Sequence, residues 1–355
     1  MAKADSASGE RKAAPMFARV ARSWPAFKHA DLALYRAGLG FAADGKAADA
    51  TTAWEELLRS HPKSEYARDS AAQIALVNEK AGKPADAAVA YERFATMYPK
   101  DADAPEALLK SADLRAAAGD AAGAEKARTQ FMAAFPGETA SVMQIRATRA
   151  QKELDACRTN NADVSALLSK KSSSELKAYL ALAAAHPDLA SPAMLAECDF
   201  LKAEEAHRSY AAMKLTQPLT ASIAKKKAKL EALIALYDQC SKRAVAEYTR
   251  ASAHRIGQSL IEFGDALSAS ERPKGLSADD LAAYNDVITE QCYTFYDRGE
   301  DAWSTLLRQS AGEKDDPGNW LAHTREVLWP RLGARFMFHP EVDYPIVRAT
   351  PPATP

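Results

Sequence analysis

The chain has 355 residues, of which 47% are hydrophobic and 26% are charged, and its net charge is −1. A net charge so close to zero argues against a general role in binding nucleic acid or anionic membranes. No stretch reaches the roughly 18 apolar residues that a membrane-spanning helix needs, and the scarcity of glycine predicts a nearly all-helical chain.

Residues 1–25 are predicted to form a polar tail followed by half of a helical repeat. The first 14 residues are polar and lack the apolar core of a signal peptide. Phe17, Val20 and Trp24 then have the spacing of a second helix whose first helix is absent. We expect a truncated chain here, because a natural start would rarely leave that face bare, and the compartment therefore stays open.

Residues 26–136 are predicted to hold three copies of a 37-residue repeat. Each copy reads as a helix, a turn with glycine, a second helix and a proline; glycine suits the left-handed end of a helix, and the residue before proline leaves the helical region. One such hairpin cannot bury its own apolar face, so the copies must stack. The residues that define the repeat are Gly38, Ala75 and Ala112 in the first helix, Gly45, Gly82 and Gly119 in the turn, Ala50, Ala87, Ala124, Trp54 and Tyr91 in the second helix, and Pro62, Pro99 and Pro136 at its end.

These positions resemble those of the tetratricopeptide repeat (TPR) family, although Arg128 replaces the aromatic residue of the third copy. The usual TPR period is 34 residues, and three residues are inserted here after each proline. This longer variant is similar to repeats of bacterial cell-envelope proteins, such as the Tol-Pal coordinator and the lipoprotein of outer-membrane β-barrel assembly. The resemblance covers about a third of the chain and implies a helical scaffold.

Residues 137–338 are predicted to be a less regular region of helical hairpins. No proline interrupts residues 219–269, so we expect one very long helix, or two in series, with Gly257 and Gly264 as the only interruptions. A helix to about Ser310 and a last helix over Trp320–Phe338, kinked at Pro330, complete the region. Residues 270–345 resemble faintly the C-terminal part of large TPR proteins of envelope and gliding machineries, which would imply a periplasmic scaffold.

Residues 339–355 are predicted to be an extended, proline-rich tail. The aromatic residues near this end either pack as a terminal helix that closes the last hairpin or form an exposed segment that docks on a partner. They are Trp320, Trp329, Phe336, Phe338 and Tyr344.

Two stretches come close to motifs for chemistry but do not complete them. Residues 40–47 resemble a phosphate-binding loop, yet Ala47 stands where that loop needs Ser or Thr, and the position of Gly45 recurs as a turn. Glu204 and His207 are one helical turn apart, as in di-iron bundles, but no second Glu-x-x-His exists. We therefore predict no enzyme, no cofactor and no metal, and keep a metal-dependent enzyme in the second half as a remote alternative.

The remaining polar and thiol groups have simple structural interpretations. The cysteines at 157, 198, 240 and 292 form no CxxC pair, so we expect buried free thiols, with one or two disulfides as the alternative in an exported protein. The lysines at 225–227 and 229 are interpreted as a solvated helix face, and a basic binding patch is the alternative.

The sequence as a whole predicts an all-α, right-handed solenoid of helical hairpins that binds a partner protein or peptide. In the TPR resemblance, the first helices line the concave groove where such a peptide lies. Plain solvation or packing inside the solenoid is the alternative at each position. The corresponding residues are Tyr35, Leu39, Asp69, Gln73, Leu76, Lys80, Glu106, Leu109, Lys110 and Asp113.

A second hypothesis is structural: upstream repeats or another subunit could cover the half-repeat at Phe17, Val20 and Trp24. The resemblance to envelope proteins favours a periplasmic or cell-envelope location, and a cytoplasmic one stays open. The sequence predicts no nucleic-acid partner and no direct insertion into a membrane.

Overall fold

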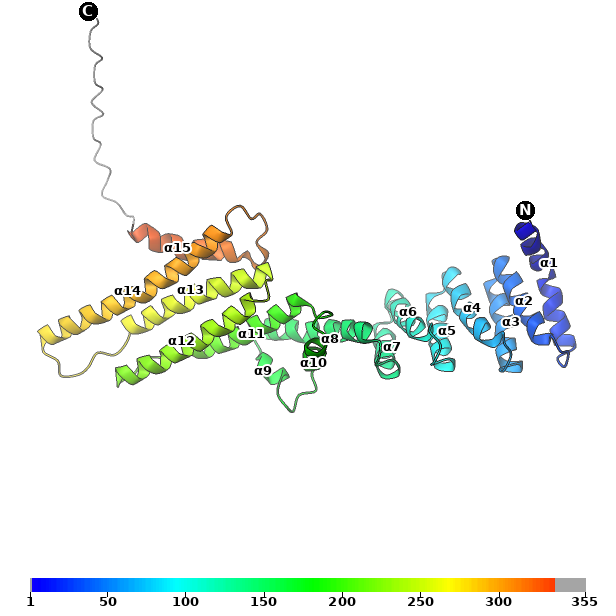
Figure 1. Cartoon of the computed structure of the whole chain (residues 1–355), viewed down its shortest axis with the longest axis horizontal. Coiled ribbons are helices and arrows are strands. Elements are labelled where there is room, and N and C mark those ends of the chain that lie inside the picture. Colours follow the sequence, from blue (N-terminus) through cyan, green and yellow to red (C-terminus); the bar gives the residue numbers. More distant parts are fainter. Residues whose placement is uncertain (1, 336–355) are drawn as a thin grey trace, which may run out of the picture. The chain divides into compact units, whose positions relative to one another are not determined.

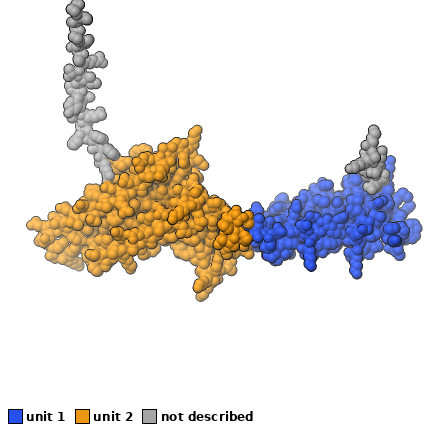
Figure 2. Space-filling view, in the orientation of Figure 1, with its two compact units in different colours: residues 1–145 blue, residues 146–355 orange. Residues whose placement is uncertain are grey.

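The structure, a computed structural model, describes residues 2–335 and the side chains of residues 12–333. Helices and connecting turns make up this described part of the chain, with no β-strand in it, which confirms the all-α fold class. The chain divides into two compact units, residues 1–145 and residues 146–355 (Figure 2). Over residues 2–335, no helix combines the length and the apolarity that a membrane crossing requires.

Unit 1 is a solenoid of short helices, in which each helix packs against the next one along the chain (Figure 1). The six helices after α1 have 14 residues each, and equivalent helices begin 37 residues apart. This regularity confirms the predicted stack of helical hairpins. The helices are α1 (Ala2–Ser23), α2 (Ala30–Ala43), α3 (Ala47–Ser60), α4 (Ala67–Lys80), α5 (Pro84–Met97), α6 (Ala104–Ala117) and α7 (Ala121–Ala134).

The turn inside each hairpin depends on a glycine in the left-handed region. Gly45, Gly82 and Gly119 have φ angles of 73°, 69° and 82°, which residues other than glycine rarely adopt. The second helix of each pair ends one residue before the aromatic or histidine that precedes the proline, as at Ser60 and Met97.

Close contact between the two helices of a pair depends on a small residue facing a large one. Trp54 of α3 is fully buried, and a Cβ atom at Gly38 of α2 would overlap its indole ring. The indole N–H donates to the backbone carbonyl of Tyr35, at 3.2 Å. In the next pair, Ala75 and Tyr91 occupy the equivalent positions, and the Tyr91 hydroxyl donates to Glu79 at 2.7 Å.

The first residues differ from the predicted tail, because α1 is one helix from Ala2 to Ser23. Pro15 lies inside it. The described part of α1 packs on α2 through Ala14, Ala18 and Ala21, which are at most 4% exposed.

Unit 2 continues the hairpin style with longer helices. Successive helices from α11 to α14 pack against one another, and α15 lies against α13 and α14 (Figure 1). The elements are α8 (Thr139–Asn160), whose first residues belong to unit 1, α9 (Val164–Leu167), α10 (Glu175–Ala185), α11 (Pro192–Ala211), α12 (Leu219–Ser241), α13 (Ala246–Ser268), α14 (Ala278–Gln309), the 3₁₀ helix η1 (Pro317–Asn319) and α15 (Trp320–Arg335).

The interruptions predicted within residues 219–269 are wrong in position. The chain turns between Ser241 and Ala246, where Ala244 has a φ angle of 56°, and α12 and α13 pack together as a hairpin. No glycine or proline marks this turn. Gly257 and Gly264 lie inside α13 instead, where side chains of α14 press against their backbone: Trp303 at Gly257 and Tyr296 at Gly264.

The C-terminal aromatic residues separate into two groups. Trp320 packs against Phe200, with ring centroids 5.9 Å apart, whereas Trp329 is 61% exposed. Pro330 lies inside α15, as predicted. Phe336, Phe338, Tyr344 and the predicted tail over residues 339–355 lie outside the described residues.

We expect Gly38→Ala to destabilise unit 1 by about 1–3 kcal/mol, because the added methyl group would force Trp54 out of its site. The measurement is urea denaturation followed by circular dichroism. Gly137→Ala is the matched control, since a Cβ there meets no atom within 4 Å, and its effect should stay within about 0.5 kcal/mol. Equal effects of the two substitutions would contradict the role given to this contact.

Candidate functional site

The first helices of unit 1 present equivalent positions in rows, because α2, α4 and α6 repeat every 37 residues. Nine of the ten residues predicted to bind a partner fall into four such rows. These rows are Tyr35 with Leu109, Leu39 with Leu76 and Asp113, Asp69 with Glu106, and Gln73 with Lys110. Lys80 shares its row with no other residue of the predicted set.

One pocket of about 180 Å³ lies between α4, α5 and α6. Leu76, Glu106 and Lys110 from the predicted set line it. The aromatic rings of Tyr91 and Phe94, from α5, also line it, and Asp103 adds a second acidic group, so the pocket combines apolar surface with two acidic side chains and one basic side chain.

A second pocket, of about 280 Å³, lies where α2 turns into α3 and beside α4. Gln73, Leu76 and Lys80 line it. Leu76 therefore belongs to both pockets, and the two pockets adjoin along α4.

The other five predicted residues lie outside these pockets. The ring of Tyr35 stacks on Tyr66, with centroids 5.1 Å apart, and Leu39 packs against the core of unit 1. Asp69 and Asp113 are exposed and pair with Arg68 and Arg128 respectively. Leu109 is half-buried.

Lys110 takes part in a small polar cluster beside the first pocket. Its ammonium lies 2.8 Å from Glu79 Oε2, and this contact, together with the Tyr91 hydroxyl, lowers the pKa of Glu79. Burial raises the pKa of Tyr91. Because an ammonium group has three donors, Lys110 holds Glu79 and keeps donors for an acceptor of a ligand.

A contact that sequence reasoning missed joins each repeat to the next. Arg68, at the start of α4, donates twice to Asp101, at 2.9 Å for each bond, and also contacts Asp103. The guanidinium holds the pKa of Asp101 at about 2. One period earlier, Ser64 donates to Asp31 at 2.6 Å. The sequence signal for this contact is a donor and an acceptor 33 positions apart in two consecutive repeats, Asp31 with Ser64 and Arg68 with Asp101.

A third pocket, of about 370 Å³, lies between the second helices α3 and α5, with α4 residues between them. Thr51, Glu55, Ile74, Lys83 and Arg93 are among its lining residues. The repeat pattern predicts no binding residue on this surface, since its residues do not match a TPR groove position.

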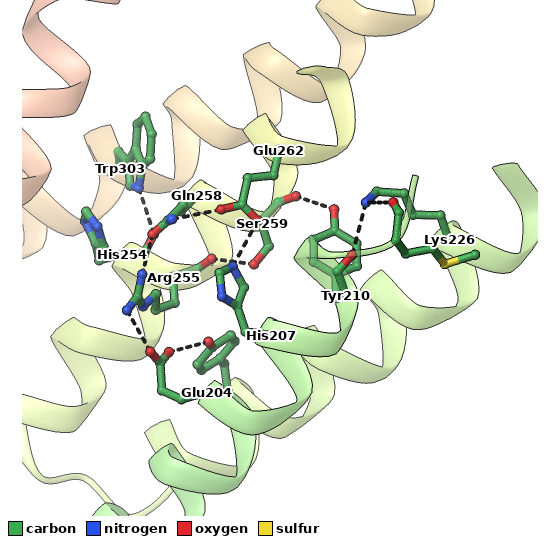
Figure 3. A network of polar contacts seen from close by, with 12 residues as sticks. Glu204, His207, Tyr210, Lys226, His254, Arg255, Gln258, Ser259, Glu262 and Trp303 are labelled. Atoms are coloured by element: carbon green, nitrogen blue, oxygen red, sulfur yellow. Dashed lines mark hydrogen bonds and ion pairs between the residues drawn. The ribbon is translucent and has the colours of Figure 1, made fainter. Parts of the chain in front are cut away.

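In unit 2, a network of polar contacts accounts for the Glu204 and His207 pair (Figure 3). The Nε2 atom of His207 lies 2.9 Å from Glu262 on α13. Glu204 accepts hydrogen bonds from Tyr237 and Arg255, both at 2.6 Å. The two side chains thus have separate protein partners, and the described residues contain no group of three or more His, Cys, Asp or Glu that could hold a metal ion.

Lys226 contradicts the predicted solvated lysine face. Its side chain is 2% exposed, and its ammonium donates to the backbone carbonyls of Tyr210 and Met213, at 3.1 and 2.7 Å (Figure 3). It thereby caps the end of α11, where a cation is favourable, and it lies 4.4 Å from the centre of the Tyr210 ring. Burial lowers the pKa of Lys226. Its neighbours Lys225 and Lys227 are exposed, as predicted.

A pocket of about 340 Å³ in unit 2 is lined by Phe200, Tyr248, Trp320 and several charged groups. Its lining holds three arginines and three glutamates, and two pairs form among them, Glu197 with Arg158 and Glu204 with Arg255. The pocket therefore offers no excess charge that would select a class of ligand.

The four cysteines are free and buried, as predicted. Burial raises the pKa of the Cys198 and Cys240 thiols, and Cys240 donates to the carbonyl of Ala196 at 3.3 Å. Both features suit inert core residues rather than nucleophiles.

Comparison with known proteins finds a family match over the regular repeats of the chain. Residues 28–178 match the family model YfiO, described as outer membrane lipoprotein. This YfiO-like stretch is similar to a bacterial cell-envelope protein of TPR type, which confirms the resemblance that the repeat predicts. It begins just before α2 and ends within α10. No curated protein matches the chain.

Outside the YfiO-like stretch, His254 joins α13 to α15. Its Nδ1 atom lies 2.8 Å from the Thr324 hydroxyl, which itself donates to the carbonyl of Trp320 at 2.7 Å. The hydroxyl oxygen is thus the acceptor, so Nδ1 carries the proton of a neutral imidazole. The ring also lies against Trp303 and Trp320, and burial lowers the pKa of His254 to about 4.

We expect unit 2 to lose stability as the pH falls from about 6.5 to about 4. In this range the unfolded chain protonates His254, whose ordinary pKa is about 6.5, while the folded chain does not. This difference in the pKa of His254 between the unfolded and the folded chain corresponds to a loss of about 3 kcal/mol in the free energy of unfolding. The measurement is urea denaturation at several pH values, compared with His254→Asn, which keeps a donor for Thr324 but cannot titrate. An identical pH dependence in both proteins would contradict this assignment.

Proposed function

We propose that the first-helix surface of unit 1 binds an extended segment of a partner protein, and that the chain is a non-enzymatic adaptor in a bacterial envelope complex. The observation that supports this most directly is the pair of adjoining pockets that share Leu76. A segment that places one side chain in each pocket would cross α4.

The chemistry of the two pockets indicates what such a segment contains. Leu76 and Phe94 offer apolar contacts, whereas Lys80, Glu106 and Lys110 offer charges of both signs. We therefore infer a partner segment with apolar anchors and both acidic and basic side chains. Such mixed surfaces give specificity more than high affinity.

The family match supports the proposed location of the adaptor in the cell envelope. The YfiO family is described as an outer membrane lipoprotein, and a role in the cell envelope comes to this chain as part of the proposal. The pockets on α4 fall within the matched residues 28–178.

Site-specific photocrosslinking tests where the partner binds. A photoreactive amino acid would replace Gln73, which lines the second pocket, in the protein expressed in its native bacterium. Val89, which is 55% exposed and lines the pocket between α3 and α5, is the matched control position. We expect one envelope protein to crosslink at position 73 and not at position 89. Crosslinks that are equal at the two positions would refute the proposal.

We expect Lys110→Glu to weaken binding of that partner by about tenfold or more, because it places an acid beside Glu79 and Glu106 and removes the donor at the pocket. Isothermal titration of the purified pair measures the loss. Lys110→Met, which removes the charge without adding repulsion, should weaken binding less.

Lys83→Glu is the control for this charge reversal, since Lys83 lines the pocket between α3 and α5. Circular dichroism would verify that all three variants fold. A loss of affinity in Lys83→Glu as large as that in Lys110→Glu would place the partner elsewhere.

A further inference from the structure

The second half of α1 occupies the place of a second helix of the repeat. The second helices α3, α5 and α7 end at Ser60, Met97 and Ala134, which are 37 residues apart, and α1 ends one further period earlier, at Ser23. Residues of α1 can therefore be compared one by one with their equivalents in three complete hairpins.

This comparison shows one face of α1 to be uncovered. Met16 is 59% exposed, whereas its equivalents Ala53, Ala90 and Ala127 are 0%, 8% and 0% exposed. Val20 is half-buried. Its equivalents are the buried residues Leu57, Phe94 and Phe131. The same contrast holds for Ala13 and Phe17, which are half-buried where their equivalents in α3 and α5 are buried.

In a complete hairpin, the first helix of the same repeat covers this face. Trp54, the equivalent of Phe17, packs against Gly38 and bonds to the Tyr35 carbonyl, both on α2. Ala53, the equivalent of Met16, clusters with Ala37 of α2 and with Ala18 of α1, the preceding second helix. On the other side, α1 already packs on α2 through its own small residues, so the uncovered face has the shape that receives one more helix.

The charges beside this face select the kind of helix that fits. Residues 12–28 contain four basic residues and no acidic one. Lys12 and Arg19 are exposed. In α3 the equivalent residues are acidic, Asp49 and Glu56. A second copy of α1 would bring like charges together, which disfavours a symmetric dimer through this face.

We propose that the α1 face (Ala13, Met16, Phe17, Val20 and Trp24) docks an acidic amphipathic helix of a partner protein, which takes the place of a first helix of the repeat. A glycine or alanine of that helix faces Phe17, as Gly38 faces Trp54. Trp24, at the end of this face, is 62% exposed and available for contact. This site is distinct from the pockets on α4, so it does not depend on the function proposed above.

A designed peptide tests the proposal with the full chain. The probe has the sequence of α4 (Ala67–Lys80) with Arg68 and Lys80 changed to Glu, and a hydrocarbon staple on its solvent side to hold the helix, because a 14-residue helix is marginal in water. Fluorescence anisotropy of the labelled probe measures binding. We expect saturable binding that weakens as salt is added.

Two matched variants locate the binding site. Met16→Glu should weaken binding of the probe by about tenfold or more, because it adds an acid to an exposed position of the α1 face. Val89→Glu places the same side chain at a similarly exposed position of α5 and should leave binding unchanged. A probe in which Leu replaces Ala75 should also bind more weakly, since its larger side chain meets Phe17.

Three results would overturn the proposal. One is no binding of the probe, and another is equal binding to the wild type and Met16→Glu. The third is a dimer in sedimentation analysis that Met16→Glu dissociates, which would make a second copy the occupant of the face. If Lys110→Glu loses the partner of the α4 pockets but binds the probe as the wild type does, the α4 pockets and the α1 face are two separate sites.

Discussion

Both units depend on one kind of contact: a large aromatic side chain lies directly on the backbone of a glycine in a neighbouring helix. Trp54 lies on Gly38 in unit 1, and Trp303 lies on Gly257 in unit 2. In each case the indole N–H donates to the carbonyl three residues before the glycine, Tyr35 in one unit and His254 in the other. The indole thus combines apolar burial with a satisfied polar group, and it fixes the distance and the register of the two helices.

The surfaces to which we assign binding follow from this arrangement. Because the close contact occupies one side of each first helix, another side is left to form rows of equivalent residues, and the pockets around Leu76 lie there. The uncovered face of α1 has the same origin, since Phe17 stands where an aromatic residue normally meets a small one. Unit 2 uses its polar groups differently: Glu204, His207 and Lys226 bond to other parts of the protein and hold long helices together.

The regular part of the fold could be predicted from the sequence because its signals are local. The 37-residue step, the turn glycines and the closing prolines locate the helices of unit 1 without further information. In unit 2 the same signals mislead: Gly257 is a packing residue, and the turn at Ala244 carries no glycine or proline. The polar network joins residues about 50 positions apart, such as His207 and Glu262. Local sequence spacing cannot predict a pair so far apart. For the candidate groove, the repeat predicts which residues share a row, but the pockets depend on how the side chains of α5 fill the space between α4 and α6.

The order in which helices pack has a consequence for how the chain reaches its structure. In unit 1 each helix contacts its neighbours along the sequence, and the link between Arg68 and Asp101 spans only 33 residues. Contacts of such short sequence separation cost little loop entropy, and chains dominated by them fold quickly. Each hairpin of unit 1 therefore has most of its partners within reach soon after it is synthesised, and the unit can be completed in the direction in which the ribosome makes it.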